Sequence, residues 1–251
     1  MITLITGATA GIGEATAYIF AKNKSNLILT GRRKERLIKL KTELVQKYNV
    51  EIKILCFDIQ SQDATEKAIA SLSESWQHID VLINNAGLAL GKTTIDDGNV
   101  EDWEQMIDTN VKGLLYITKA IVPFMKARKK GHIVNLGSIA GKEVYRYGNV
   151  YCATKHAVEA LTKGFRLDLL PYNIKVTGIC PGPVETEFSI VRYKGDKEKA
   201  KEVYKDFSPL VAEDIAECIW FAVSRPAHVN INDMLIMPMQ QANTSSFSKK
   251  S

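Results

Sequence analysis

A tyrosine and a lysine stand four residues apart at Tyr151 and Lys155. On a helix, side chains at this spacing rise from the same face, with Cβ atoms about 5–6 Å apart. A cation beside a phenol favours the ionised form of the phenol, so such a pair can work as an acid and base. The same spacing recurs at residues 18–22 and 193–197. The surrounding elements must therefore decide which pair is functional.

The elements around the two rival pairs favour neither of them. Residues 193–197 contain Gly195, which interrupts a rigid helix. Residues 18–22 close an outer helix, and no loop that could hold an electrophile lies beside it in the sequence. We therefore expect the functional pair to be Tyr151 and Lys155.

Short apolar runs alternate with amphipathic segments along the whole chain. This alternation predicts an α/β protein with a single doubly wound Rossmann fold, in which a seven-stranded, mostly parallel sheet has helices on both faces. We expect one domain over residues 1–239, a lid at about 186–210 and a polar C-terminal tail over 240–251. The expected strands are 2–6, 26–30, 51–57, 80–83, 131–136, 173–179 and 234–237. The expected helices are 14–22, one that ends at 48, 61–76, 100–128, 151–172 and 213–224.

A glycine-rich loop joins the first strand to the first helix. Glycines without a Cβ let the backbone approach a pyrophosphate, and the helix N-terminus offers free N–H groups and a favourable dipole. The strand–turn–helix context makes this pattern more informative than the glycines alone. The cofactor contacts expected from this loop are Gly7, Thr9, Gly11, Ile12 and Gly13.

Two arginines follow the second strand, where a dinucleotide-binding fold meets the adenosine ribose. An acidic residue there would bind the two ribose hydroxyls of NAD, whereas arginine pairs with a 2′-phosphate. No acid ends this strand, and Arg32 and Arg33 come directly after it. These residues favour NADP as the cofactor, although both arginines could also simply begin a surface helix.

Further polar and small residues lie where the other strands end, at the edge where α/β sheets bind ligands. Asp58 could accept from the adenine amino group or cap a turn. Ser138 stands between glycines after the fifth strand, 13 residues before Tyr151, so one loop can bring both around one oxygen atom. Asn110 interrupts a long helical pattern and indicates a kink. The remaining expected cofactor contacts are Asn85, Ala86, Gly87, Pro181, Gly182, Val184 and Thr186.

Taken together, these motifs resemble the short-chain dehydrogenase/reductase family over nearly the whole chain. The resemblance implies that Tyr151 is the general acid and base, and that Lys155 binds the nicotinamide ribose. It also implies that Ser138 stabilises the substrate oxygen and that Asn110 holds a water that relays protons to Lys155. Val184 and Thr186 would position the nicotinamide carboxamide. Family members are commonly homotetramers.

Three stretches, residues 31–33, 191–196 and 226–232, are similar to the NADP-dependent 3-hydroxy acid (serine) dehydrogenase subgroup. Such a substrate needs a carboxylate partner, which Arg192 or Arg146 could provide, although either could instead be surface charge. Residues 142–146 depart from the subgroup pattern and leave the substrate open. The alternatives are a 3-oxoacyl-thioester reductase of the same family and a non-catalytic NADP-binding redox sensor. The intact set of Ser138, Tyr151 and Lys155 argues against the sensor.

The composition excludes several other classes of protein. A net charge of +5, from 33 basic and 28 acidic residues in 251, is spread along the chain and does not indicate nucleic-acid binding. No apolar run approaches the roughly 20 residues that span a bilayer. The four cysteines are isolated, with no C-x-x-C pair and no accompanying histidine cluster, which predicts no metal site and a cytoplasmic protein with reduced thiols.

Overall fold

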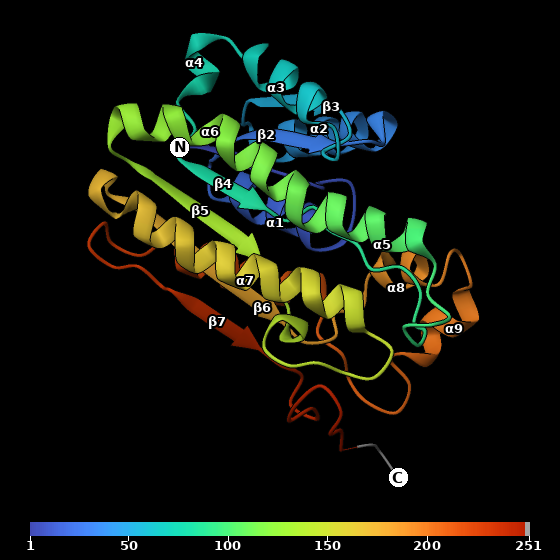
Figure 1. The fold of residues 1–251 in the computed structure, drawn as a ribbon. Coiled ribbons are helices and arrows are strands. Elements are labelled where there is room, and N and C mark those ends of the chain that lie inside the picture. The colour runs from blue at the N-terminus through green and yellow to red at the C-terminus, as the bar shows by residue number, and fades with distance from the viewer. Residues whose placement is uncertain (249–251) are drawn as a thin grey trace.

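Seven parallel strands form a single sheet in the computed structural model, which describes residues 1–248 (Figure 1). The strand order is β3-β2-β1-β4-β5-β6-β7, and every pair of neighbours is parallel. The predicted fold class is confirmed, and the sheet is parallel throughout. The strands are β1 (Ile2–Ile5), β2 (Asn26–Gly31), β3 (Ile52–Cys56), β4 (Val81–Asn84), β5 (Gly131–Leu136), β6 (Ile174–Pro181) and β7 (Asp233–Ile236).

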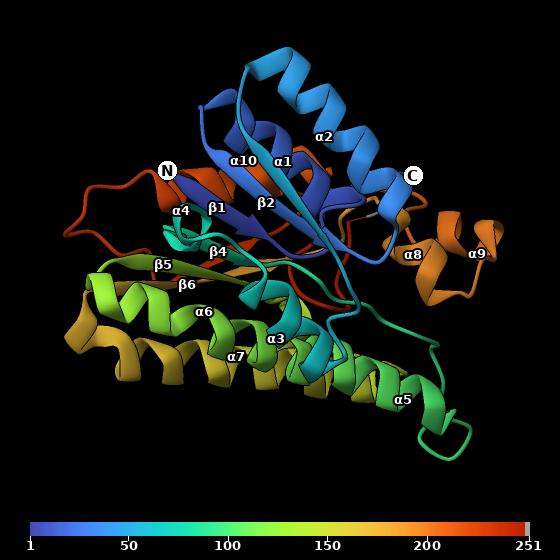
Figure 2. The ribbon, with the colours of Figure 1, turned by 90° about the horizontal axis from the view of Figure 1, so that it is seen from above.

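Helices cover both faces of the sheet, as Figure 2 shows. One face carries α1 (Gly11–Lys22), α2 (Lys34–Tyr48) and α10 (Ala212–Val223), and the other carries α3 (Gln62–Ala70), α6 (Leu114–Arg128) and α7 (Asn149–Leu169). The central strands are therefore buried on both sides and are mostly apolar, although β5 also buries His132 and Asn135. Two apolar cores result, one on each side of the sheet.

The connection between β3 and β4 creates the binding crevice. From β1 the chain moves outward to β2 and β3, and then crosses back to place β4 on the other side of β1. In doubly wound sheets, ligands bind at the carboxyl ends of the strands where the order reverses in this way. Leu4 of β1 pairs with both Ile28 and Leu82, so β1 lies at the centre of this reversal.

The predicted helix over residues 61–76 is two helices in the structure. The first, α3, is capped by the Ser61 hydroxyl and ends at Ala70, and α4 (Glu74–Gln77) follows after three residues. The Ser71 hydroxyl donates to the Ala68 carbonyl at the break, and buried Leu72 turns into the core. Local hydrogen bonds of serine compete with helix continuation in this way.

The predicted long helix over residues 100–128 has three parts. The first, α5 (Val100–Ile107), passes into a π-helical segment, η1 (Asp108–Gly113), and then into α6. The interruption predicted at Asn110 is therefore a π-helical segment. A proline in a helix interior commonly bends or breaks the helix, but α6 continues past Pro123 to Arg128.

Two segments close the carboxyl-end edge of the sheet. The expected lid region holds two short helices, α8 (Glu187–Arg192) and α9 (Lys197–Glu202). The C-terminal tail packs against the lid through the rings of Phe207 and Phe247, whose centroids lie 5.1 Å apart. Residues 249–251 of the tail lie outside the described part of the chain. Among the helices of residues 1–248, none has the length and apolar character needed to cross a bilayer.

Candidate active site

An elongated cavity of about 760 Å³ follows the carboxyl ends of the strands. It is lined by nearly all of the residues predicted to bind the cofactor, together with Ser138, Tyr151, Lys155 and Arg192. Three predicted residues do not line it: Gly13, Asn110 and Arg146. The structure thus brings most of the expected site into one cavity.

The glycine loop at one end of this cavity depends on its lack of side chains. Gly7 has a φ of +65°, in the left-handed region that favours glycine. A Cβ on Gly13 would stand 2.4 Å from both the Asn85 Nδ2 and the Gly7 carbonyl, so Gly13 permits the close packing behind the loop. Asn85 Nδ2 donates to the carbonyls of Thr6 and Gly7. The side chain of Asn85 therefore supports the loop, while its backbone belongs to the cavity wall.

The two arginines after β2 differ in their surroundings. Arg33 donates through Nε and Nη2 to Thr9 Oγ1, at 3.1 and 2.7 Å, which fixes it beside the glycine loop. Arg32 is 61% exposed and reaches Asp58 at 3.5 Å. Asp58 also accepts from the Gln60 N–H, as a turn-capping residue does. Arg33 is the better-positioned ligand for an anion at this end of the cavity.

Tyr151 lies in the first turn of α7, and only 8% of its surface is exposed. Burial raises the pKa of Tyr151, because the charged phenolate loses its hydration. The neighbouring Ser138 hydroxyl and the positive charge of Arg192 oppose this effect and lower the pKa of Tyr151. Lys155, the cation expected from the sequence to favour the phenolate, lies on the same helix with its Nζ 6.0 Å from the centre of the Tyr151 ring.

Lys155 is buried one helical turn after Tyr151. Its Nζ donates to the Leu136 carbonyl at 2.8 Å and lies 6.0 Å from the centre of the Tyr151 ring. Burial lowers the pKa of Lys155 to about 8, since the ammonium group loses water and gains no acidic partner. The lysine is thus a desolvated cation that faces the cavity.

Ser138 stands at the end of β5 with its backbone fully extended. Its Oγ accepts from the Ala140 N–H at 3.1 Å and donates to the Pro181 carbonyl at 3.5 Å. These contacts place the hydroxyl between β5, β6 and the phenol of Tyr151. A single oxygen atom of a ligand can therefore be reached by both hydroxyls.

Asn110 lies behind the cavity wall, inside the π-helical segment. Its Nδ2 donates to the Leu88 carbonyl at 2.8 Å and to Thr154 Oγ1 at 3.0 Å, and its Oδ1 accepts from the Leu88 N–H. A Cβ on Gly87 would stand 3.2 Å from Asn110 Oδ1 and 3.6 Å from Lys155 Nζ. Asn110 thus joins η1 to α7 beside Lys155.

The two candidate carboxylate ligands are separated by the structure. Arg146 is exposed and stacks over Tyr147 at 4.7 Å, away from the cavity. Arg192 ends α8 and faces the cavity, with its Cζ 5.6 Å from the centre of the Tyr151 ring. Its Nη2 is buried and has no hydrogen-bond partner among residues 1–248. Arg192 is therefore the arginine with unused hydrogen-bonding capacity next to the reactive phenol.

Several residues of the site were not predicted from the sequence. Lys92 lines the cavity near Arg192, and burial together with the charge of Arg192 lowers its pKa. Glu187 forms ion pairs with Arg33 and Arg36, and Arg36 lies one helical turn after Arg33. These residues mark the adenosine end of the cavity, the end next to Arg33 where the adenosine of a dinucleotide would lie. That spacing of three residues was the available signal for Arg36. Lys92 stands in an irregular stretch that carries no comparable pattern.

Neither of the two rival Tyr–Lys pairs lies with both of its residues at the cavity. The Tyr18 hydroxyl donates a hydrogen bond to the Glu43 carboxylate, and this bond raises the pKa of Tyr18 to about 12. Neither Tyr18 nor Lys22 lines the cavity. Tyr193 lines it, but Lys197 begins α9 and the two are separated by Gly195 with a φ of +94°. Tyr151 and Lys155 are thus the one pair of the three whose two members both line the cavity.

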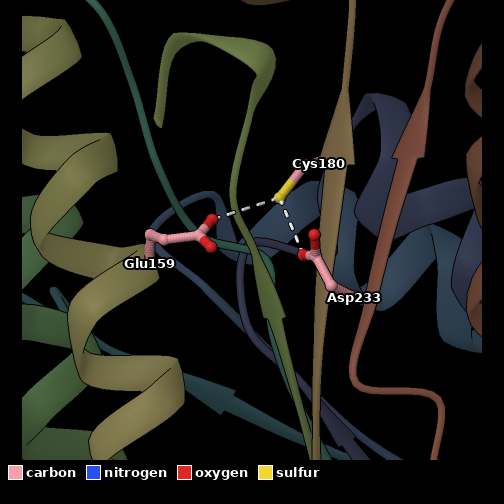
Figure 3. Close-up of side chains that lie close together, drawn as sticks. All are labelled: Glu159, Cys180 and Asp233. Carbon is pink, nitrogen blue, oxygen red and sulfur yellow. Dashed lines mark hydrogen bonds between the residues drawn. The ribbon is translucent and has the colours of Figure 1, made fainter. Parts of the chain in front are cut away.

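A cluster of side chains not expected from the sequence joins α7, β6 and β7. Figure 3 shows Glu159, Cys180 and Asp233 with their polar atoms pointing toward one another. Lys142 Nζ lies 2.6 Å from both Glu159 Oε1 and Asp233 Oδ2, so an ammonium group already occupies the position that a cation would take. Burial raises the pKa of Cys180 to about 12, which keeps its thiol protonated. The cluster is an ion-pair network that ties the Lys142 loop to α7 and β7.

Comparison with known proteins shows which sequences and structures the chain is similar to. The family model described as "short chain dehydrogenase" matches residues 1–197. The chain is 49% identical to the NADP-dependent 3-hydroxy acid dehydrogenase YdfG of Salmonella typhi over 243 residues, which is 96% of each chain. It is 45% identical to the serine 3-dehydrogenase of Agrobacterium fabrum, over 95% of this chain and 94% of that protein.

A solved structure extends the comparison to three dimensions. The closed form of a serine dehydrogenase complexed with NADP+ superimposes with a TM-score of 0.93 at 46% identity. The match covers 100% of both chains.

Proposed function

Since the chain belongs to the short-chain dehydrogenase family, we propose that it is an NADP-dependent oxidoreductase acting on a short 3-hydroxy acid or a β-hydroxy amino acid such as serine. It transfers a hydride between the nicotinamide and the carbon that bears the hydroxyl group. One observation carries this proposal: a single cavity is lined by Arg33 beside the glycine loop and by Ser138, Tyr151 and Arg192, whose Nη2 has no hydrogen-bond partner among residues 1–248. The similarity to 3-hydroxy acid and serine dehydrogenases agrees with it.

The residues around the cavity fit NADP. The glycine loop carries no side chains at Gly7 and Gly11, which line the cavity, so a pyrophosphate could approach its backbone, and Arg33 is held beside it for the 2′-phosphate. When bound, the cofactor supplies or accepts the hydride. Gly182, Val184 and Thr186 also line the cavity and are the residues that would hold the carboxamide.

Tyr151 moves the proton in this proposal. In carbonyl reduction its hydroxyl donates to the substrate oxygen, and in alcohol oxidation its phenolate accepts the hydroxyl proton. Ser138 donates to the same oxygen and stabilises the negative charge that develops there. Since burial raises the pKa of Tyr151, nearby cations are needed before the phenolate forms near neutral pH.

Lys155 and Asn110 support this proton transfer. The ammonium group of Lys155 is a buried cation on the same helix as Tyr151, 6.0 Å from the centre of its ring. It can also bind the ribose hydroxyls. Asn110 connects η1 to Thr154, the neighbour of Lys155, and its Oδ1 lies close to Gly87 at the cavity wall. We propose that a water in this region passes protons from Lys155 to solvent.

Arg192 and Lys92 bind the substrate carboxylate in this proposal. Both cations line the cavity near Tyr151, and no carboxylate among residues 1–248 forms an ion pair with either of them. Two neighbouring cations repel each other, which contributes to the lowered pKa of Lys92. An anionic group between them would relieve this repulsion and occupy the unused Nη2 of Arg192.

We also propose that the protein is a cytoplasmic homotetramer. Large apolar side chains remain exposed on the helices that carry the site residues, including Ile107 on α5 and Leu167 on α7. Burial of such residues between subunits is a common reason for their exposure in one chain. The four cysteines are free thiols, as is usual in a reducing compartment. Light scattering should give four times the mass of the chain.

A substrate screen tests the proposed activity. The enzyme is incubated with NADP and a panel of hydroxy acids, β-hydroxy amino acids and uncharged alcohols, and NADPH formation is followed by absorbance. The reverse reaction is measured with 3-oxoacyl groups attached to a carrier protein. Turnover of free hydroxy acids supports the proposal, whereas turnover of carrier-linked substrates alone would replace it with a thioester reductase.

A further inference from the structure

The adenosine end of the cavity already holds an anion of the protein itself. The Glu187 carboxylate accepts from Arg33 Nη1 at 2.9 Å and from Arg36 Nη1 at 2.8 and 2.9 Å, so both of its oxygens are used. Its hydrogen bond with Arg33 lowers the pKa of Glu187, which keeps it charged at neutral pH. These are the cations that a 2′-phosphate would need.

Glu187 also begins the helix that carries Arg192. It is the first residue of α8 and Arg192 is the last, so about 9 Å of helix joins the adenosine end to the substrate end of the cavity. Figure 2 shows α8 beside one end of α2, the helix that holds Arg36. The two ion pairs of Glu187 connect α8 directly to this end of α2.

A 2′-phosphate and the Glu187 carboxylate are ligands of the same kind. Both accept paired hydrogen bonds from a guanidinium group, but the phosphate carries more charge and a third oxygen. It can therefore displace the carboxylate from Arg33. The ribose hydroxyl that NAD has in this position is uncharged and cannot do so.

We propose that Glu187 is a specificity-determining residue that occupies the 2′-phosphate site until NADP displaces it. Displacement frees the start of α8, so that binding of the 2′-phosphate is coupled to the helix that positions Arg192. Glu187 thus lowers the affinity for NADP and restrains the lid before the cofactor binds. This inference rests on the proposed assignment of Arg33 to the 2′-phosphate.

The test compares Glu187→Gln with wild type in fluorescence titrations of NADPH and NADH. The variant should bind NADPH about three- to tenfold more tightly, because two partly exposed ion pairs no longer compete. NADH affinity should stay within about twofold. Glu185→Gln is the matched control, since Glu185 is exposed, loses the same charge and forms none of these pairs. It should leave both affinities unchanged.

Hydrogen exchange provides a second readout in the same proteins. Without cofactor, amides 188–192 should exchange faster in Glu187→Gln than in wild type, and with NADPH bound the two proteins should exchange alike. Weaker or unchanged NADPH binding in Glu187→Gln would overturn the inference, as would equal tightening for NADH or for the Glu185 control. If Arg33→Ala leaves NADPH affinity unchanged, the cofactor-site assignment itself fails. If Arg33→Ala weakens NADPH binding but Glu187→Gln does not tighten it, only the role of Glu187 fails.

Discussion

Replacing Arg192 by methionine removes a charge next to the reactive phenol while it keeps most of the side-chain volume. The guanidinium Nη2 is buried and has no partner among residues 1–248, while Nε donates to the Gly91 carbonyl at 3.3 Å. A hydrogen bond to a charged group contributes about 1.5–3 kcal/mol. Loss of one such hydrogen bond, from the Arg192 guanidinium to a substrate carboxylate, should therefore reduce kcat/KM for a 3-hydroxy acid by about 10- to 150-fold.

The assay compares an acid with its uncharged ester. Initial rates of NADPH formation are measured for a 3-hydroxy acid and its methyl ester, with wild-type enzyme and with Arg192→Met. The ester should lose no more than about threefold, because it never formed the ion pair. Arg146→Met is the control, since Arg146 stacks on Tyr147 outside the cavity and should leave both substrates unaffected.

The pH dependence provides a second measurement on the same variant. Arg192 lowers the pKa of Tyr151, so its removal should raise that pKa. Because alcohol oxidation needs the phenolate, the pH at which its rate rises should move upward. The reasoning is refuted if Arg192→Met loses activity equally on the acid and the ester, or if its rate on the acid stays within about threefold of wild type. It is also refuted if Arg146→Met, and not Arg192→Met, loses activity on the acid.

Three further variants test other parts of the site and the fold. Tyr151→Phe should abolish turnover and leave the NADPH dissociation constant within about twofold, as measured by fluorescence titration; retained activity would contradict the proton-transfer role. Arg33→Ala should reduce the NADPH-to-NADH affinity ratio by at least about tenfold, and Arg32→Ala should reduce it less, because Arg32 is 61% exposed; the reverse order would show that Arg32 is the main ligand. His132 has a pKa lowered to about 3 by burial, so the unfolded chain binds a proton first and wild type should lose up to ~5 kcal/mol of stability as pH falls from 6.5 to 3. His132→Asn should lack that part of the loss in urea unfolding, and parallel pH curves would refute it.

The sequence predicted the sheet well because the strands are buried on both faces. Short, mostly apolar runs such as β4 and β5 show no helical periodicity. The break between α3 and α4 was missed, because it depends on the hydroxyl of Ser71 and the burial of Leu72, which act only once the helix packs. In the same way, the tolerance of Pro123 within α6 is not visible in the local pattern.

The site was predictable as a set of residues, but not as a set of contacts. Motif spacing together with the surrounding strands and helices was enough to group Ser138, Tyr151 and Lys155 at one site. The choice between Arg146 and Arg192 required tertiary structure, since both are arginines in irregular or short elements. The raised pKa of Tyr151 also required it, because the exclusion of water depends on all the elements packed around the phenol.

The π-helical segment makes the site sensitive to chain length. A segment of this kind accommodates one residue more than an α-helix of the same rise. Deleting a single residue from Asp108–Gly113 would turn the segment into regular α-helix, and α5 and α6 would keep the faces that they now present. The loss would fall on the segment itself, because the extra residue directs Asn110 toward Leu88 and Thr154. A deletion within α5 would instead rotate the residues before it by about 100° and could turn a buried residue out of the core. The π-helical segment therefore positions Asn110 without disturbing the packing of the helices on either side.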